Sequence, residues 1–294
     1  MDILRKVLSF IDKRYKILII ASLTIFFIFF GFVLKTYFET GYLFYRDISL
    51  RGGTSIEVPI KEKIDVQELI SFLNSRFPNI NIKIIRHPIT GNVIYINMEG
   101  PEDLNKTEIL NSLKEFGLNI DEKEISVYSF SEKYGKAFYD QFLKLIIIAA
   151  ILTSIVIYLR VKVPVATITI IFSTLFDIIC TIGLLNLLGY EIADAALAAL
   201  LMIIGYAIDD NIIISTHFNR YKGKPFVERI YRASLTAITL TLTTVVAVLV
   251  LFLFVRVRII EQIAFILLVS ELFDEINTWL FNLPLYKWYS TREK

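Results

Sequence analysis

Long apolar runs separated by shorter polar stretches dominate the hydropathy pattern of this 294-residue chain. An α-helix needs about 20 predominantly apolar residues to cross the hydrocarbon core of a bilayer. Six runs reach that length, at 16–36, 141–160, 164–187, 192–216, 234–255 and 259–284. The first run stands alone before a polar block, and the other five follow one another closely. The pattern predicts a polytopic α-helical membrane protein with six transmembrane helices.

The polar block, roughly 44–131, shows shorter periods. Apolar residues recur at strand spacing in four segments and at helical spacing in two. The strand-like segments are 48–60, 80–86, 93–98 and 124–130, and the helical segments are 66–77 and 104–116. Thr90-Gly91-Asn92 predicts a tight turn between the second and third strands. The order strand-helix-strand-strand-helix-strand predicts an α+β ferredoxin-like domain, in which two helices cover one face of the sheet.

The distribution of Lys and Arg predicts the orientation. Basic residues gather in the N-terminus, in the loops near 160–162 and 220–232, and in the C-terminal tail, which all fall on one side if the spans alternate. We therefore expect a protein of the cell membrane with both termini in the cytoplasm. Arg256 and Arg258 are exceptions to the charge pattern, because they would lie on the opposite side of the membrane. We divide the chain into a cytoplasmic N-terminus with transmembrane helix 1 (1–40), an extracytoplasmic ferredoxin-like domain (41–135), and transmembrane helices 2–6 with a cytoplasmic C-terminus (136–294).

Composition supports the membrane assignment and excludes several functions. Hydrophobic residues make up 55% of the chain, which leaves too little polar surface for a soluble domain. The net charge of +2 gives no reason to expect nucleic-acid binding, and the single Cys180 excludes an internal disulfide. No phosphate-binding loop, zinc-ligand spacing or nucleophile motif is present. We expect no enzymatic activity, no cofactor and no metal site.

Acidic residues inside the apolar runs are the strongest functional signal. A carboxylate at the centre of a spanning helix costs about 2.5–3.5 kcal/mol and is functional by default. The acids within or bordering the last four spans are Asp177, Asp194, Asp209, Asp210, Glu271, Asp274 and Glu275. They cannot all be ionised in a dry bundle, so several are expected to be protonated. The alternative is that neutral acids merely hold the bundle together through hydrogen bonds between helices.

The adjacent pair Asp209-Asp210, preceded by Gly205 and followed by Asn211, is the best candidate for a proton or ion relay. Asp177 in the third span is a further candidate. Three acids of the last span, Glu271, Asp274 and Glu275, share one helical face. They would either line the same water path or bind the cation of a partner.

Two stretches resemble signatures of the SecD/SecF family of protein-export proteins. After the first span, the chain matches the pattern D-x-x-x-x-G-G-T-x-x-E-V with Asp47, Gly52, Gly53, Thr54 and Glu57. In the fourth span, residues 204–210 are similar to the motif I-G-Y-S-V-N-D. Asp177 fits a third-span His-Asp motif, with Phe176 in place of His. The outer domain is shorter than about 100 residues, so the chain resembles the SecF half of the family.

The resemblance implies an accessory subunit of the Sec protein translocase. It would pair with a SecD-like subunit, act beside the Sec translocon channel on exported polypeptides, and draw on the proton (or sodium) motive force. By this resemblance, Asp210 is the main proton-binding carboxylate and Asp177 assists it. Charge movement would swing the outer domain about a hinge at 131–137, where Gly135 is expected to break the helix.

Departures from the family pattern leave the coupling open. Asp209 stands where the family usually has Asn, and the fifth span lacks the Arg of bacterial members. Either Asp209 and Asp210 share a proton, or a SecD-like subunit supplies a cation, or coupling differs in this lineage. The missing His and Arg indicate an archaeal relative. Two other functions are also considered: a proton-coupled exporter of small molecules or lipids from the same superfamily, and a non-transporting membrane scaffold.

Overall fold

The computed structural model describes residues 2–60, 65–86, 91–101, 104–118, 120–161, 164–221, 223–255 and 257–292. The chain divides into two units. The helical unit comprises Met1–Tyr45 and Phe142–Lys294, and the sheet unit comprises Arg46–Gln141. Each is described by itself below.

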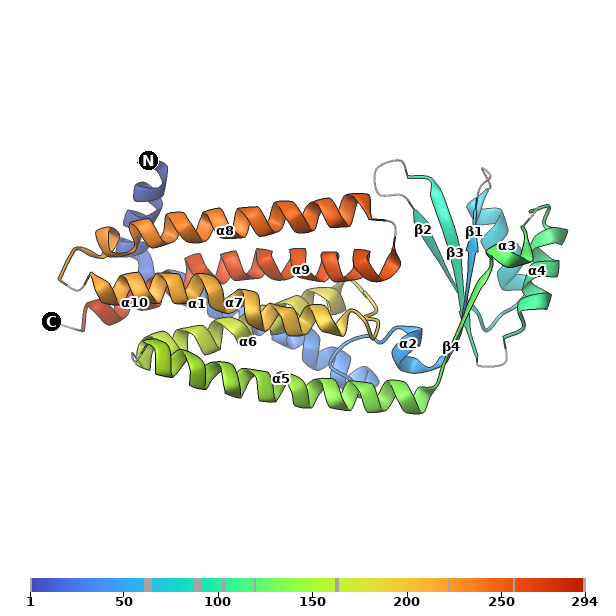
Figure 1. Ribbon diagram of the computed structural model, residues 1–294, viewed down its shortest axis with the longest axis horizontal. Coiled ribbons are helices and arrows are strands. Elements are labelled where there is room, and N and C mark those ends of the chain that lie inside the picture. Colours follow the sequence, from blue (N-terminus) through green and yellow to red (C-terminus); the bar gives the residue numbers. More distant parts are fainter. Residues whose placement is uncertain are drawn as a thin grey trace. The chain divides into compact units, whose positions relative to one another are not determined.

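Long helices form the helical unit (Figure 1). They are α1 (Asp2–Thr40), α6 (Pro164–Leu187), α7 (Leu197–Arg220), α8 (Phe226–Phe254), α9 (Arg258–Asn277), a π-helical segment (Thr278–Asn282), α10 (Leu283–Ser290), and the greater part of α5 (Glu132–Val161). Among the described residues, five helical segments are long and apolar enough to cross a membrane: Ile3–Thr40, Glu132–Leu159, Ala166–Leu187, Leu197–Arg220 and Phe226–Phe254. The predicted sixth span is divided among α9, the π-helical segment and the start of α10. Four acids interrupt the apolar sequence of α9, so a sixth span stays a prediction.

Close packing positions α6 at the centre of this unit. It contacts α1, α7 and α9. A Cβ added to Gly183 would lie 2.5 Å from the carbonyl oxygen of Phe29, so glycine permits the close approach of α6 to α1. Aromatic rings fill the space between α1, α6 and α9, with Phe176 fully buried against Phe273 and Phe26. Cys180 is buried in the same cluster, as expected for a small apolar residue.

The sheet unit contains the strands and helices that the periodicity predicts, in the predicted order. The strands are β1 (Gly53–Pro59), β2 (Asn81–Arg86), β3 (Val93–Gly100) and β4 (Ser126–Phe130), and the main helices are α3 (Val66–Arg76) and α4 (Lys106–Glu115). The sheet order is β2-β3-β1-β4, and every pair is antiparallel. Helices α3 and α4 cover the same face of the sheet (Figure 1).

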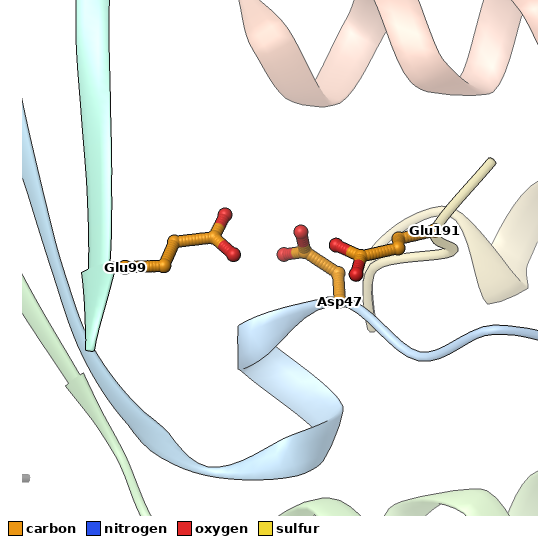
Figure 2. A group of neighbouring side chains, drawn as sticks. All are labelled: Asp47, Glu99 and Glu191. Atoms are coloured by element: carbon orange, nitrogen blue, oxygen red, sulfur yellow. The ribbon is translucent and has the colours of Figure 1, made fainter. Parts of the chain in front are cut away.

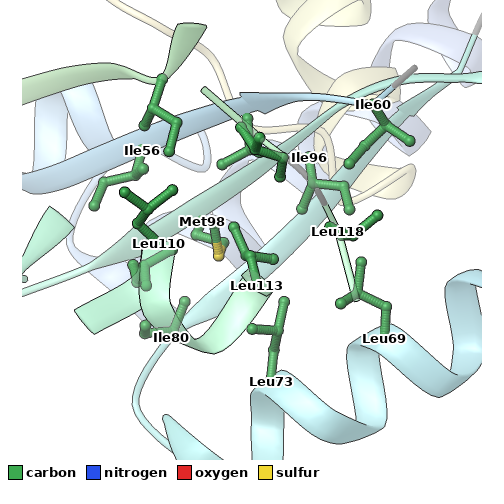
Figure 3. Close-up of a cluster of buried hydrophobic side chains, with 14 residues drawn as sticks. Ile56, Ile60, Leu69, Leu73, Ile80, Ile96, Met98, Leu110, Leu113 and Leu118 are labelled. Carbon is green, nitrogen blue, oxygen red and sulfur yellow. The ribbon is translucent and has the colours of Figure 1, made fainter. Parts of the chain in front are cut away.

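Alternation along the strands builds the core of the sheet unit. Successive side chains of a strand point to opposite faces, so Ile56 and Val58 of β1 point to the helix-covered face, as do Ile96 and Met98 of β3. They pack against Leu69 and Leu73 of α3 and Ile109 and Leu113 of α4 (Figure 3). Each helix begins at a polar cap: Asp65 and Asn105 accept hydrogen bonds from the backbone at Gln67 and Thr107, both at 2.9 Å.

Two local predictions are wrong. Residues 48–51, predicted as the start of a strand, form the short helix α2 (Ile48–Arg51). Gly52, at φ +87°, ends this helix and lets β1 begin at Gly53. Gly135 does not break a helix, because α5 runs through it without interruption. A side chain there would instead collide with the carbonyl oxygen of Leu50, so glycine allows α2 to lie against α5.

Candidate functional site

The aspartate pair lies on α7, as the hydropathy pattern predicts. Asp209 and Asp210 occupy helical positions directly before Asn211. Their side chains lie outside the described part of the structure, so their role as a relay stays a prediction. Gly205, one turn earlier, is exposed, and no described atom lies within 4 Å of a Cβ built on it.

A buried polar network begins at the next residue. Asn211 is fully buried, and its amide donates to the Ser173 hydroxyl on α6 (3.0 Å) and to the Ala207 carbonyl oxygen (2.6 Å). Its own side-chain oxygen accepts from Asn282 Nδ2 at 2.7 Å. The amides of Asn282 (3.1 Å) and Asn277 also reach Ser173. Three amide groups from three different segments therefore converge on one hydroxyl of α6.

Asp177 lies one turn after Ser173 on α6 and is completely buried. Both of its carboxyl oxygens are buried, and no donor among the described residues reaches either of them. The group within hydrogen-bonding range is another carboxyl, that of Asp274 on α9, and Glu271 is close enough to interact electrostatically. Two ionised carboxylates are both acceptors, so a hydrogen bond between them requires one proton. The pair can hold a proton between α6 and α9.

The other acids predicted for the last span behave differently from one another. Asp274 and Glu271 are buried and face α6, near Asp177. Glu275 is half-buried and accepts a hydrogen bond of 2.5 Å from the indole nitrogen of Trp279 on the next turn. The structure therefore separates Glu275 from the carboxyl pair formed by Asp177 and Asp274.

Asp47, the first residue of the family-like motif, belongs to an ionic network in the sheet unit. Its carboxyl group and that of Glu99 point toward one another (Figure 2), and both residues are buried. The ammonium group of Lys83 on β2 lies 3.0 Å from Asp47 Oδ1 and 2.7 Å from Glu99 Oε1. Arg51 (3.3 Å) and Asn97 (3.0 Å) also donate to Glu99. Asp47 thus joins α2 to the sheet.

The remaining motif residues shape the start of β1. A Cβ on Gly52 would lie 2.6 Å from the backbone nitrogen of Glu132, and a Cβ on Gly53 would lie 2.5 Å from the Gly100 carbonyl oxygen. Thr54 is buried, with its hydroxyl 3.4 Å from that of Ser129 on β4. Glu57 is half-buried on β1, opposite Asn97. Within the sheet unit these contacts give the motif a structural role, because they fix the junction of α2, β1 and the start of α5.

The sequence signalled part of this arrangement. The sequence pattern points to Asn211, because it follows the aspartate pair, but it gives no reason to select Ser173, Asn277, Asn282 or Lys83. A neutral amide or hydroxyl inside an apolar helix is a weak signal, because such groups also serve ordinary packing between helices. Asn277 directly precedes the π-helical segment and Asn282 is its last residue, and no local pattern predicts that segment.

Comparison with known proteins places these features in a wider group. Residues 109–292 match the family described as "Protein export membrane protein SecD/SecF, C-terminal". The chain is 34% identical to the protein-export membrane protein SecF of Methanocaldococcus jannaschii, over 84% of this chain and 87% of the relative. It is 28% identical to SecF of Pyrococcus furiosus, over 97% of this chain and 94% of the relative.

Solved structures show a shared fold. The crystal structure of SecDF, a translocon-associated membrane protein from Thermus thermophilus, matches with a TM-score of 0.70 at 18% identity. A SecDF structure in a super-membrane-facing form matches with a TM-score of 0.60 at 19% identity. Each match covers 96% of this chain, whereas this chain spans only 38% and 39% of the respective SecDF chains.

Proposed function

Because the chain belongs to the SecD/SecF family of protein-export membrane proteins, we propose that it is a SecF-type subunit. It pairs with a SecD-type subunit and assists the Sec translocon channel in the late steps of polypeptide export. The SecF relatives match over nearly their whole length, which supports the SecF assignment. The SecDF chains are more than twice as long as the part that this chain matches, which supports a functional assembly larger than this chain.

The proposal includes six spans, cytoplasmic termini and a ferredoxin-like outer domain in the cell membrane. An antiparallel sheet of order β2-β3-β1-β4 with both helices on one face supports the ferredoxin-like assignment. Segment α9 with the π-helical segment and α10 supplies the sixth crossing, since two of its acids, Glu271 and Asp274, are buried near Asp177 of α6. The basic residues at both ends of the chain support a cytoplasmic location for both termini.

The buried carboxyl pair of Asp177 and Asp274 is the observation that carries the coupling proposal. Moving one elementary charge across the membrane releases about 2.3 kcal/mol of free energy per 100 mV of membrane potential. Asp210 and Asp209 bind the transported proton or ion on α7, and the carboxyl pair holds a proton between α6 and α9. Ser173 links the two places, because it bonds Asn211 beside the aspartate doublet and lies one turn from Asp177.

Proton loss from either place changes which helices attract one another. An ionised Asp177 repels Asp274 and Glu271 across the α6–α9 contact, and the amide network transmits the shift to α7. The charge state of these acids thereby shifts the equilibrium between two arrangements of the helices. An export motor driven by the membrane potential requires such a shift.

Potential-dependent export in proteoliposomes tests the proposal. The chain is reconstituted with a SecD-type subunit and the channel, and export of a model polypeptide is measured with and without an imposed proton gradient. Asp210→Asn is expected to abolish the gradient-dependent part of export, and Asp177→Asn to reduce it, with folding intact in both. Asp140→Asn, which neutralises an exposed acid on α5, is the matched control. Gradient-dependent export at the wild-type rate in Asp210→Asn would remove the doublet from the mechanism.

A further inference from the structure

The first three turns of α1 form a distinct segment. The helix is kinked at Arg14, where φ is −116° and ψ is 16°. Before the kink, Leu8 and Ile11 are buried in a cluster with Phe218, Ile230 and Tyr286 of α7, α8 and α10. One face of this segment is therefore held firmly against the end of the bundle.

A second face of the segment is apolar and uncovered. Ile3, Val7 and Phe10 have 79%, 41% and 56% of their surface exposed. They recur at helical spacing, so they form one stripe. Basic residues (Arg5, Lys6 and Lys13) stand beside this stripe, and all of them are exposed. An apolar stripe bordered by bases is typical of a helix that lies in the membrane interface.

Two hollows open beside these bases. The larger, of about 580 Å³, lies between the segment and the start of α8 and is lined by Arg5, Tyr221, Lys224, Glu228, Tyr231 and Arg232. A second, of about 430 Å³, adjoins it through Arg5 and adds Lys6 and Lys13. Among the described residues that line the two hollows, five are bases and one, Glu228, is an acid. We call the two together the basic hollow.

Ring contacts position two bases of the hollow, and no acid among the described residues pairs with any of the five. The Arg5 guanidinium lies 5.3 Å from the centre of the Tyr231 ring, and Lys224 Nζ lies 5.1 Å from that of Tyr221. Arg5, Lys6, Lys13, Lys224 and Arg232 make no ion pair with any carboxylate in the described part of the chain. The turn that carries Lys224 connects α7 to α8, and the buried Arg229 of α8 holds the two helices together beside it. Its guanidinium group donates two hydrogen bonds to the Phe218 carbonyl oxygen of α7 (3.1 and 2.8 Å).

We propose that the basic hollow binds the phosphate headgroup of an anionic phospholipid, with the acyl chains lying along Ile3, Val7 and Phe10. The charge of the five bases matches a phosphodiester, and bases near an anionic membrane surface attract it strongly. The place also fits, because the hollow lies at the ends of α1 and α8, two helices that can cross a membrane. The adjoining apolar stripe distinguishes a lipid from free phosphate. This inference is independent of the proposed role in export.

Native mass spectrometry of the full chain, purified in an uncharged detergent, tests the inference. Phosphatidylglycerol is titrated in, and the number and affinity of retained lipid molecules are measured. Phosphatidylglycerol is expected to bind in preference to phosphatidylcholine, and sodium phosphate at equal concentration is expected not to displace it. Equal retention of both lipids, or displacement by sodium phosphate alone, would overturn the assignment.

A triple variant locates the binding. Arg5→Gln, Lys224→Gln and Arg232→Gln together are expected to weaken phosphatidylglycerol binding roughly a hundredfold, at about fivefold per base. The matched control removes three exposed lysines of the sheet unit, Lys114→Gln, Lys123→Gln and Lys133→Gln, and is expected to bind as the wild type does. Helical circular dichroism confirms that each variant is folded. Undiminished binding in the first variant, or an equal loss in the control, would contradict the site.

Discussion

Replacing Lys83 by Met isolates the energetic role of the ionic network that holds Asp47 to the sheet. The ammonium group of Lys83 lies within 3.0 Å of two carboxylates, Asp47 and Glu99. The side chains of these acids are only 5% and 2% exposed. Met fills a similar volume but removes the charge, so both acids lose the cation that they share.

The structure sets the size of the effect. Removing one partner of a buried ion pair costs about 3–5 kcal/mol. Two features reduce this value here: Lys83 itself is 24% exposed, and Arg51 keeps its contact with Glu99 at 3.3 Å. We therefore expect the sheet unit to lose about 2–3 kcal/mol of stability. Because 1.4 kcal/mol corresponds to a factor of ten, local opening becomes roughly 30 to 150 times more frequent.

Hydrogen exchange of the full chain, followed by mass spectrometry of a peptide from β3, measures this opening. Exchange in β3 is expected to accelerate by the stated factor in Lys83→Met. Lys114→Met, on an exposed position of α4, serves as the control and should leave it unchanged. Adding Glu99→Gln to Lys83→Met is expected to restore much of the protection, because one buried charge disappears. Wild-type exchange in the single variant would refute the reasoning.

Three further substitutions have defined outcomes. Gly52→Ala is expected to lower the stability of the sheet unit by at least about 2 kcal/mol, because a side chain at this positive φ would also collide with α5. Gly91→Ala, which has a positive φ but open space around it, should lower stability by about 1 kcal/mol. Equal rates of hydrogen exchange in β1 of the two variants would count against this account. Gly183→Ala should force α6 away from α1, which costs about 1–3 kcal/mol of stability and lowers the thermal unfolding midpoint of the detergent-solubilised chain. Gly31→Ala should leave the midpoint unchanged, because the added Cβ meets no atom within 4 Å. Identical midpoints for the two variants would disprove the close-approach argument. Arg229→Lys should cost about 1.5–3 kcal/mol, since Lys cannot reproduce the two hydrogen bonds to one carbonyl, and a midpoint equal to the wild type would show that this anchor is dispensable.

Local patterns predict the strands and helices of the sheet unit well, because each of these elements carries its own period. The alternation in β1 and β3 and the helical spacing in α3 and α4 act over a few residues, and these segments formed as expected. The predicted start of β1 at residue 48 is wrong, because apolar residues at 48 and 50 fit a strand and a short buried helix equally well. The turn at Gly52 decides between them, and it depends on contacts with α5 that lie far along the chain.

Partners across the fold were beyond sequence reasoning. Asp47 was recognised through a motif, yet its partner Lys83 lies on another strand and has no local mark. Asp177 and Asp274 were each recognised as acids in apolar runs. A hydropathy pattern does not determine how each helix is rotated about its own axis. It therefore cannot show that α6 and α9 turn these two acids toward each other. It also could not separate Glu275 from them.

Infrared difference spectroscopy of the chain in lipid bilayers tests the central claim most directly. If Asp177 and Asp274 hold a proton between them, the wild type shows the carbonyl stretch of a hydrogen-bonded carboxylic acid, shifted by deuteration. Asp177→Asn and Asp274→Asn are each expected to abolish or displace this band, and Asp140→Asn is expected to keep it. A wild-type spectrum without such a band, or a band that persists unchanged in both pair variants, would contradict the account.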